Sequence, residues 1–153
     1  MANTYTQINI HVVFATSGRE TVLKKEIRER LFSYINGIIK GLGLFPLAIN
    51  GEKDHVHLFF ELNPDKSLSK VVQEIKSNSS KWINDNRLMP GHFNWQNGYG
   101  GFSYSRSQRN DVIRYIMNQE EHHAKRSFKE EYLELLSKFE IDFDDIYLFE
   151  FYD

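Results

Sequence analysis

The sequence predicts an α+β fold with a ferredoxin-like or RRM-like antiparallel sheet, helices packed on one sheet face and a candidate active site on the other. The first observation is the order of the predicted elements, which is strand, helix, strand, strand, helix, strand. The second is the spacing of apolar residues, which alternate in the predicted strands and recur every three or four positions in the predicted helices. In this topology the first and third strands are neighbours at the sheet centre.

The first strand and the first helix follow from these spacings. Residues 5–15 alternate, which turns four apolar side chains towards the core and leaves Asn9 and His11 on the opposite face. The four core-facing residues are Ile8, Ile10, Val12 and Phe14. Apolar residues at helical spacing then run from Leu23 to Ile39, and Gly41 marks the predicted helix end.

A hairpin and a second helix are predicted next. The apolar runs 44–49 and 55–62 flank the sequence NGEKD, in which Asn-Gly favours a tight reversal. Ser67 is a plausible N-cap for a helix that ends before Pro90. These elements complete the order strand, helix, strand, strand, helix.

The remaining elements complete the sheet and add two helices. Residues 93–105 mix aromatic residues with glycines and predict a short strand, a turn and another short strand. Ser107 is a plausible cap for a helix over residues 111–124, with Val112 and Ile116 facing the core. A last helix is predicted over residues 128–139, followed by an aromatic tail or an edge strand.

Length and composition predict one soluble domain. A chain of 153 residues is long enough for a single core, so we expect one domain over residues 1–153. The absence of cysteine excludes disulfides and thiolate metal sites, and it favours the cytoplasm. No signal peptide or membrane-spanning run is recognised, so no membrane partner is expected.

The charge distribution leaves a nucleic-acid partner open. The formal net charge of -2 argues mildly against binding a polyanion. However, acidic residues crowd the C-terminal end, whereas many basic residues lie in the middle of the chain. A local basic face is therefore compatible with the net charge. The candidate DNA contacts are Lys76, Lys81, Arg106, Arg109 and Arg114.

Two stretches carry candidate chemistry. His55 and His57 alternate with Val56 on a predicted strand, so both imidazoles point to the face away from the core. Tyr115 and Gln119 are four positions apart on a predicted helix, which places the phenol beside the amide. Two imidazoles and an amide oxygen around a metal, with a phenol next to them, indicate attack on a phosphate.

Simpler interpretations of these residues stay open. The histidines could be a surface pair, and the tyrosine could pack its ring and expose its hydroxyl. His11 is a candidate partner of a metal-binding histidine or an ordinary hydrogen-bonded histidine, and His122 and His123 are a possible extra site. No phosphate-binding Gly-rich loop, Gly-x-Ser-x-Gly or His-Glu-x-x-His motif is present, so no nucleotide cofactor is expected.

Several motifs together resemble a known family, the HUH-type single-tyrosine transposases of small bacterial insertion sequences, including relatives associated with repetitive extragenic palindromes (REP). The matching segments are residues 11–16 (HVVFAT), 54–58 (DHVHL), 95–105 (WQNGYGGFSYS), 112–123 (VIRYIMNQEEHH), 127–131 (SFKEE) and 141–148 (IDFDDIYL). They span nearly the whole chain in family order.

The resemblance implies roles for the four residues already selected. Tyr115 is the implied nucleophile, and the implied metal ligands are His55, His57 and Gln119, holding Mg²⁺ or Mn²⁺. The implied reaction is cleavage and rejoining of single-stranded DNA at hairpin-ended element termini through a 5′-phosphotyrosine intermediate. The resemblance also implies a homodimer in which the tyrosine helix can complete the partner's histidine site.

Three alternatives stay open. A domesticated host enzyme derived from a transposase would have the same sequence features. A replication initiator or relaxase would use the same chemistry, although those proteins are usually larger. A non-catalytic nucleic-acid-binding module would require exposed aromatic residues on the sheet face.

Overall fold

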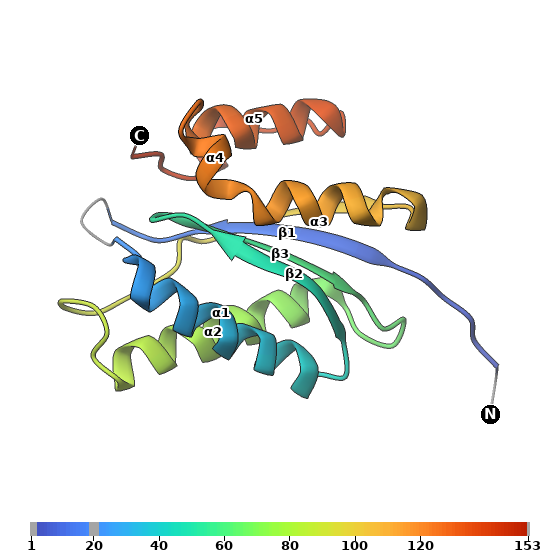
Figure 1. Ribbon diagram of the computed structural model, residues 1–153, viewed down its shortest axis with the longest axis horizontal. Coiled ribbons are helices and arrows are strands. Elements are labelled where there is room, and N and C mark those ends of the chain that lie inside the picture. Colours follow the sequence, from blue (N-terminus) through green and yellow to red (C-terminus); the bar gives the residue numbers. More distant parts are fainter. Residues whose placement is uncertain (1–2, 19–21, 153) are drawn as a thin grey trace.

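The computed structural model describes residues 3–18 and 22–152, which form one antiparallel sheet with helices on both faces (Figure 1). The strands are β1 (Asn9–Ala15), β2 (Phe45–Gly51), β3 (His55–Glu61) and β4 (Gly100–Tyr104), in the sheet order β2-β3-β1-β4. The helices are α1 (Lys25–Gly41), α2 (Leu68–Asp85), α3 (Arg109–Met117), α4 (Gln119–His123) and α5 (Phe128–Lys138). Two single 3₁₀ turns are η1 (Arg106–Gln108) and η2 (Asp145–Tyr147). The predicted α+β fold is confirmed.

The two central strands bring their histidines onto one face of the sheet. β1 and β3 pair antiparallel, with His11 opposite Phe59 and Val13 opposite His57. Directly opposed residues of an antiparallel pair share a face. The predicted adjacency of the first and third strands is therefore confirmed, and His11 lies on the same face as His55 and His57.

One face of the sheet packs against α1 and α2 (Figure 1), and the side chains between them form an apolar core. Val12 and Phe14 of β1 and Leu58 and Phe60 of β3 have no exposed surface. The two helices contribute their own buried aliphatic residues, which include Leu31, Ile35, Ile39, Val72 and Ile75. The hydroxyl oxygen Oγ of Ser67 accepts a hydrogen bond from the backbone N–H of Lys70 at 3.2 Å, which confirms the predicted N-cap of α2.

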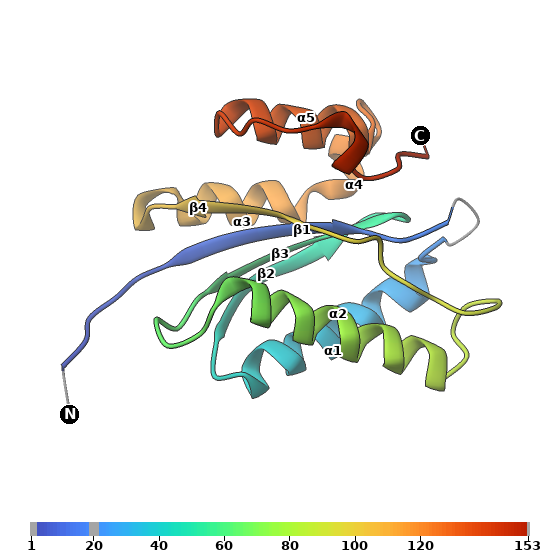
Figure 2. The same cartoon turned by 180° about the vertical axis from the view of Figure 1, so that it is seen from behind.

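The opposite face is covered by α3, α4 and α5 rather than left open (Figures 1 and 2). Val112 and Ile116 of α3 pack on Ala48 and Phe59, as their predicted inward positions require. α5 approaches β4 closely, because a Cβ atom added at Gly100 would lie 2.8 Å from the Tyr132 hydroxyl. The candidate active site therefore lies between the sheet and a layer of helices.

Several element boundaries differ from the sequence prediction. The helix expected over residues 111–124 is broken at Asn118 into α3 and α4. Its cap is also different, because Ser105 forms a capping box with Gln108 in η1, and Gln108 rather than Ser107 stands at the N-cap position of α3. The first strand begins at Asn9 rather than residue 5, and the short strand expected near residue 93 is reduced to one bridge between Thr16 and Trp95.

The C-terminal segment forms the tail rather than the edge strand of the two predicted alternatives. Phe149 is buried, and its ring centroid lies 5.0 Å from that of Tyr132 on α5. Among the described residues, no helix has the length and apolar character needed to cross a membrane.

Candidate active site

The alternation of β3 supplies the first half of the site. His55 and His57 leave the same face of the strand, and both side chains are fully buried. Nε2 of His11 lies 2.8 Å from Nδ1 of His57, so the three histidines form a connected group on β1 and β3. Nδ1 of His55 lies 2.8 Å from Asp54 Oδ1, and that carboxylate fixes the orientation of the ring.

The broken helix supplies the second half. Asn118 ends α3 with non-helical backbone angles, and the side-chain amide of Asn50 donates to the freed carbonyls of Ile116 and Met117 at 3.0 and 3.2 Å. The chain then restarts at Gln119, whose Oε1 lies 3.2 Å from His55 Nε2. Tyr115 lies above His57, with ring centroids 5.9 Å apart.

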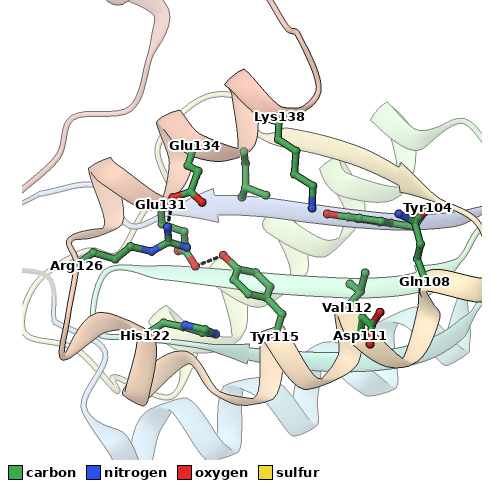
Figure 3. Close-up of a pocket in the computed structure, with 11 residues that line it drawn as sticks. Tyr104, Gln108, Asp111, Val112, Tyr115, His122, Arg126, Glu131, Glu134 and Lys138 are labelled. Carbon is green, nitrogen blue, oxygen red and sulfur yellow. Dashed lines mark hydrogen bonds and ion pairs between the residues drawn. The ribbon is translucent and has the colours of Figure 1, made fainter.

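A carboxylate that sequence reasoning missed lies at the centre of the group. Glu131 of α5 is 1% exposed, and its Oε1 accepts hydrogen bonds from Nε2 of His57 at 3.2 Å and of His123 at 3.1 Å. The same oxygen lies 3.4 Å from His55 Nε2. Its Oε2 accepts from the Gln119 amide at 3.1 Å and from the Tyr115 hydroxyl (Figure 3).

The sequence held a signal for Glu131. It lies three positions after Phe128 and four before Leu135, both buried, so it belongs to the apolar stripe of an amphipathic helix. A carboxylate in such a stripe needs buried partners. Its partners are 74 residues away at His57 and 76 residues away at His55, so the sequence alone did not identify them.

Burial and hydrogen bonding together shift the pKa values of the three histidines on β1 and β3. Although burial lowers the pKa of His55, hydrogen bonds to Asp54 and Glu131 raise it to about 9. Burial lowers the pKa of His57, and the contact with Glu131 offsets only part of this. Burial and the neighbouring His57 lower the pKa of His11 well below its ordinary value.

Glu131 and Tyr115 are held in different protonation states. Burial favours the neutral form of Glu131, but hydrogen bonds from His123, His55 and His57 hold its pKa well below the ordinary value. Burial, together with the Glu131 charge, raises the pKa of the Tyr115 hydroxyl far above its ordinary value. In this arrangement Glu131 is a carboxylate and Tyr115 is a protonated phenol.

The cluster has a donor set that fits a divalent cation. Single donor atoms of His55, His57 and Glu131 all lie within 4.8 Å of one another, and all three side chains are buried. Gln119 Oε1 adds a fourth oxygen at 3.2 Å from His55 Nε2. Imidazole nitrogens with carboxylate and amide oxygens suit Mn²⁺ and comparable ions.

The two candidate histidines of α4 lie in different surroundings. His123 contacts both Gln119 Oε1 and Glu131 Oε1 at 3.1 Å, so it joins the central cluster. His122 instead lies beside the nucleophile candidate, with its ring centroid 4.9 Å from that of Tyr115.

The five basic residues selected as DNA contacts are not on one surface. Lys76 and Lys81 belong to α2, on the face away from the histidines (Figure 2). Lys76 Nζ donates to the backbone oxygens of Gln96 and Gly98 at 2.6 and 2.9 Å, and Lys81 Nζ lies 2.6 Å from Asp85. These contacts tie both lysines to neighbouring parts of the chain.

The three arginines lie at the start of α3 and along it. Arg109 is directed inwards, where its guanidinium pairs with Glu61 and donates to Asn9 Oδ1 at 3.0 Å. Arg106 and Arg114 are exposed, and Arg114 pairs with Asp111. The structure brings together the four predicted catalytic and metal-binding residues, but it separates the predicted DNA contacts.

A pocket of about 340 Å³ opens beside the Tyr115 side chain, between α3 and α5 (Figure 3). Tyr115 and Glu131 line it together with Tyr104 of β4 and Lys138 at the end of α5. The phenol is therefore accessible from a cavity even though its hydroxyl is hydrogen-bonded to a buried acid.

Comparisons with known proteins point in one direction. The family model described as "Transposase IS200 like" matches residues 4–119. A crystal structure from Deinococcus radiodurans R1, of a protein provisionally named a transposase, is similar with a TM-score of 0.63 and 24% identity, covering 78% of this chain and 95% of that chain.

A second similar structure is a REP-associated tyrosine transposase bound to a REP hairpin. It has a TM-score of 0.57 and 15% identity, and the match covers 77% of this chain and 70% of that chain. At these identities both structures support the fold. No curated protein sequence matches the chain significantly.

Proposed function

The chain belongs to the IS200-like transposase family, since the family model matches residues 4–119, and on that premise we propose that it cleaves and rejoins single-stranded DNA through Tyr115. The proposed substrate is single-stranded DNA whose element termini carry hairpins. The similar transposase bound to a REP hairpin supports this choice.

One observation carries the proposal. The carboxylate of Glu131 contacts the Tyr115 hydroxyl and the Nε2 atoms of both His55 and His57. A nucleophile and a set of metal-binding donors are thereby held around one point inside the protein. Such preorganisation is what attack on a positioned phosphate requires.

The covalent step exchanges one phosphate ester for another. Tyr115 Oη forms a bond to the phosphorus, the bond to the 3′-oxygen breaks, and the leaving oxygen takes up a proton to become a 3′-hydroxyl. The product is a 5′-phosphotyrosine. Because one phosphate ester bond replaces another, the number of these bonds is unchanged. Attack by another 3′-hydroxyl on the phosphotyrosine therefore reverses the step, and no ATP is needed.

Tyr115 must lose its proton for this attack. Its hydroxyl donates to Glu131, so the carboxylate is placed to receive the phenol proton. In the arrangement described, the histidines keep Glu131 charged and Glu131 keeps Tyr115 protonated. Substrate binding or a change of charge at the cluster is therefore needed before attack.

The residues that would hold Mg²⁺ or Mn²⁺ are His55, His57 and an oxygen donor. Gln119 was the donor expected from the sequence, and the position of Glu131 makes its carboxylate a further candidate. A divalent ion bound by these groups supplies positive charge that polarises the scissile phosphate.

A homodimer, which the family resemblance implies, does not by itself decide whether each active site is built from one chain or from two. Tyr115 lies over the histidines of its own chain, and Gln119 contacts His55 of the same chain. We therefore propose that each active site is assembled within one chain, even if the protein dimerises. Mixing Tyr115→Phe and His57→Ala chains tests this, since activity recovered in the mixture would indicate assembly across two chains.

The alternative of a non-catalytic binding module has little support. It requires aromatic residues on an open sheet face. Here Phe59 and His57 on that face have no exposed surface, because Phe59 packs on Val112 and Ile116 of α3 and His57 contacts Glu131 of α5. A domesticated enzyme would retain the same site and the same chemistry.

The proposal is tested by incubating the protein with hairpin-ended single-stranded DNA and Mn²⁺, then scoring a denaturant-resistant protein–DNA adduct. Tyr115→Phe should abolish the adduct. Tyr147→Phe makes the same change at a tyrosine that is 82% exposed and far along the chain, and it should leave the yield unchanged. An adduct that persists in Tyr115→Phe would overturn the assignment.

A further inference from the structure

The pocket between α3 and α5 contains more than the nucleophile. Tyr115 lines it, and Tyr104 and Val112 (Figure 3), together with Leu135, add an aromatic ring and two apolar side chains to the lining. A volume of about 340 Å³ falls at the small end of the range for ligand pockets. The space therefore suits one small unit of a substrate rather than several.

Most charges in this pocket are already paired. The Arg126 guanidinium pairs with Glu134, and Asp111 pairs with Arg114 at the pocket edge. Glu131 is directed towards the histidines. These carboxylates are thus compensated by neighbouring cations or histidines.

Lys138 is the exception among the charges that line the pocket. Its side chain extends from the end of α5 into the cavity, and within the described part of the chain it forms no ion pair (Figure 3). Its Nζ lies 5.9 Å from the centroid of the Tyr104 ring. An uncompensated ammonium beside an aromatic ring is complementary to a ligand that carries both an anion and a flat apolar group.

The Tyr104 ring is held in a fixed orientation. Phe59 and Phe139 contact it edge to face, with centroid distances of 6.1 and 5.4 Å and interplanar angles of 88° in both cases. A ring that is immobilised before binding loses little entropy when a base stacks on it. The aromatic wall of the pocket is therefore preorganised.

We infer that this pocket binds one nucleotide of the single-stranded substrate, the one next to the scissile phosphate, with its base against Tyr104 and its phosphate near Lys138. The inference rests on the proposed function, because the Tyr115 hydroxyl on the pocket wall is what places the scissile phosphate next to this pocket. Leu135 and Lys138 lie beyond residues 4–119, the part of the chain that the family model matches.

The pocket is tested by binding, without any covalent step. The full chain carrying Tyr115→Phe is titrated with fluorescent pentathymidylate, and anisotropy gives the affinity. Lys138→Gln should weaken binding about 10-fold. Lys129→Gln removes the same charge from the same helix at an exposed residue outside this pocket, and it should have no effect.

A second probe separates the base from the phosphate. An abasic pentamer of the same length retains the phosphates and lacks the bases. Tyr104→Leu should weaken pentathymidylate binding about 10-fold and leave binding of the abasic pentamer unchanged. Equal weakening of both probes, or equal affinities of Lys138→Gln and Lys129→Gln, would overturn the inference.

Two further readouts keep the test decisive. If Tyr104→Leu does not fold, as judged by circular dichroism, a central 4-thiothymidine in the probe should photocrosslink to a peptide that contains Tyr104 or Leu135. A crosslink confined to other peptides would contradict the pocket. If the covalent adduct forms equally well in Lys138→Gln and Lys129→Gln, the proposed cleavage reaction is supported and the proposed nucleotide binding in the pocket is contradicted.

Discussion

The two faces of the sheet are built by opposite means. On the face that packs against α1 and α2, β1 and β3 contribute only apolar side chains to the core. On the face that packs against α3 and α5, the same strands bury histidines. The first face is held by the burial of apolar surface. The second buries polar groups whose hydrogen bonds must compensate for lost hydration.

This difference explains what each face can do. An apolar core stabilises the fold but has no reactive group, and its side chains tolerate apolar substitutions that conserve volume. The polar face holds a carboxylate, three contacting histidines and a phenol in one network around Glu131. Such a network constrains geometry, which is what a catalytic site needs.

The largest effect on stability is expected on the apolar face. Phe60→Ala removes a fully buried ring from the core and should lower the free energy of unfolding by about 3 to 5 kcal/mol, as measured by urea denaturation. The fraction that stays folded should bind Mn²⁺ with unchanged affinity. Loss of that affinity would mean that the two faces are not independent.

The next largest effect is expected on the polar face and concerns activity. His57→Ala removes one of the proposed metal ligands and should slow adduct formation about 100-fold or more. His92→Ala makes the same change at an exposed histidine and should leave the rate unchanged. A His57→Ala protein with the wild-type rate would exclude His57 from the site.

An intermediate effect, on the free energy of unfolding, is expected when the pH of the metal-free protein is raised. The pKa of His55 is about 9 in the folded chain, above the value of 6.5 for an unperturbed histidine. Its stabilising contribution is therefore complete below pH 6.5 and is lost as pH rises towards 9. Between pH 6.5 and 8, the free energy of unfolding should fall by up to about 2 kcal/mol.

The control for this titration is His55→Asn, which lacks the ionisable group and should give a flat profile over the same interval. His57 does not interfere, because its lowered pKa places its effect below pH 6.5. Urea denaturation in EDTA at each pH provides the measurement. Wild-type stability that is constant or rises across the interval would show that His55 is neutral in the folded chain.

The smallest effect is expected for a charge on the outer side of α2. Lys81→Gln should change the affinity for hairpin-ended DNA by less than about 2-fold, because Lys81 pairs with Asp85 away from the histidines. Arg106→Gln, at an exposed position just before α3, should weaken binding more. Equal losses would indicate that DNA also crosses α2.

The sequence predicted the apolar face well because its pattern is local. Alternation in β1 and β3 and helical spacing in α1 and α2 each depend on residues close together in the chain. The same alternation also placed His55 and His57 on a common face. Hence the strand half of the site was predictable.

The helical half was predictable only in part. The four-residue spacing of Tyr115 and Gln119 indicated their proximity, but the break at Asn118 depends on Asn50 of β2, which is distant in sequence. Glu131 joins the site through tertiary contacts between α5 and β3. No local pattern specifies such contacts, although a carboxylate in an apolar stripe was a sign of them.

The central claim is that Tyr115 is the residue that becomes joined to DNA. After reaction with hairpin-ended single-stranded DNA and Mn²⁺, the adduct is digested with nuclease and protease and the modified peptide is sequenced by mass spectrometry. We expect a nucleotide attached through its 5′-phosphate to Tyr115, with Tyr104 unmodified. Attachment at Tyr104, or at any residue other than Tyr115, would contradict the claim.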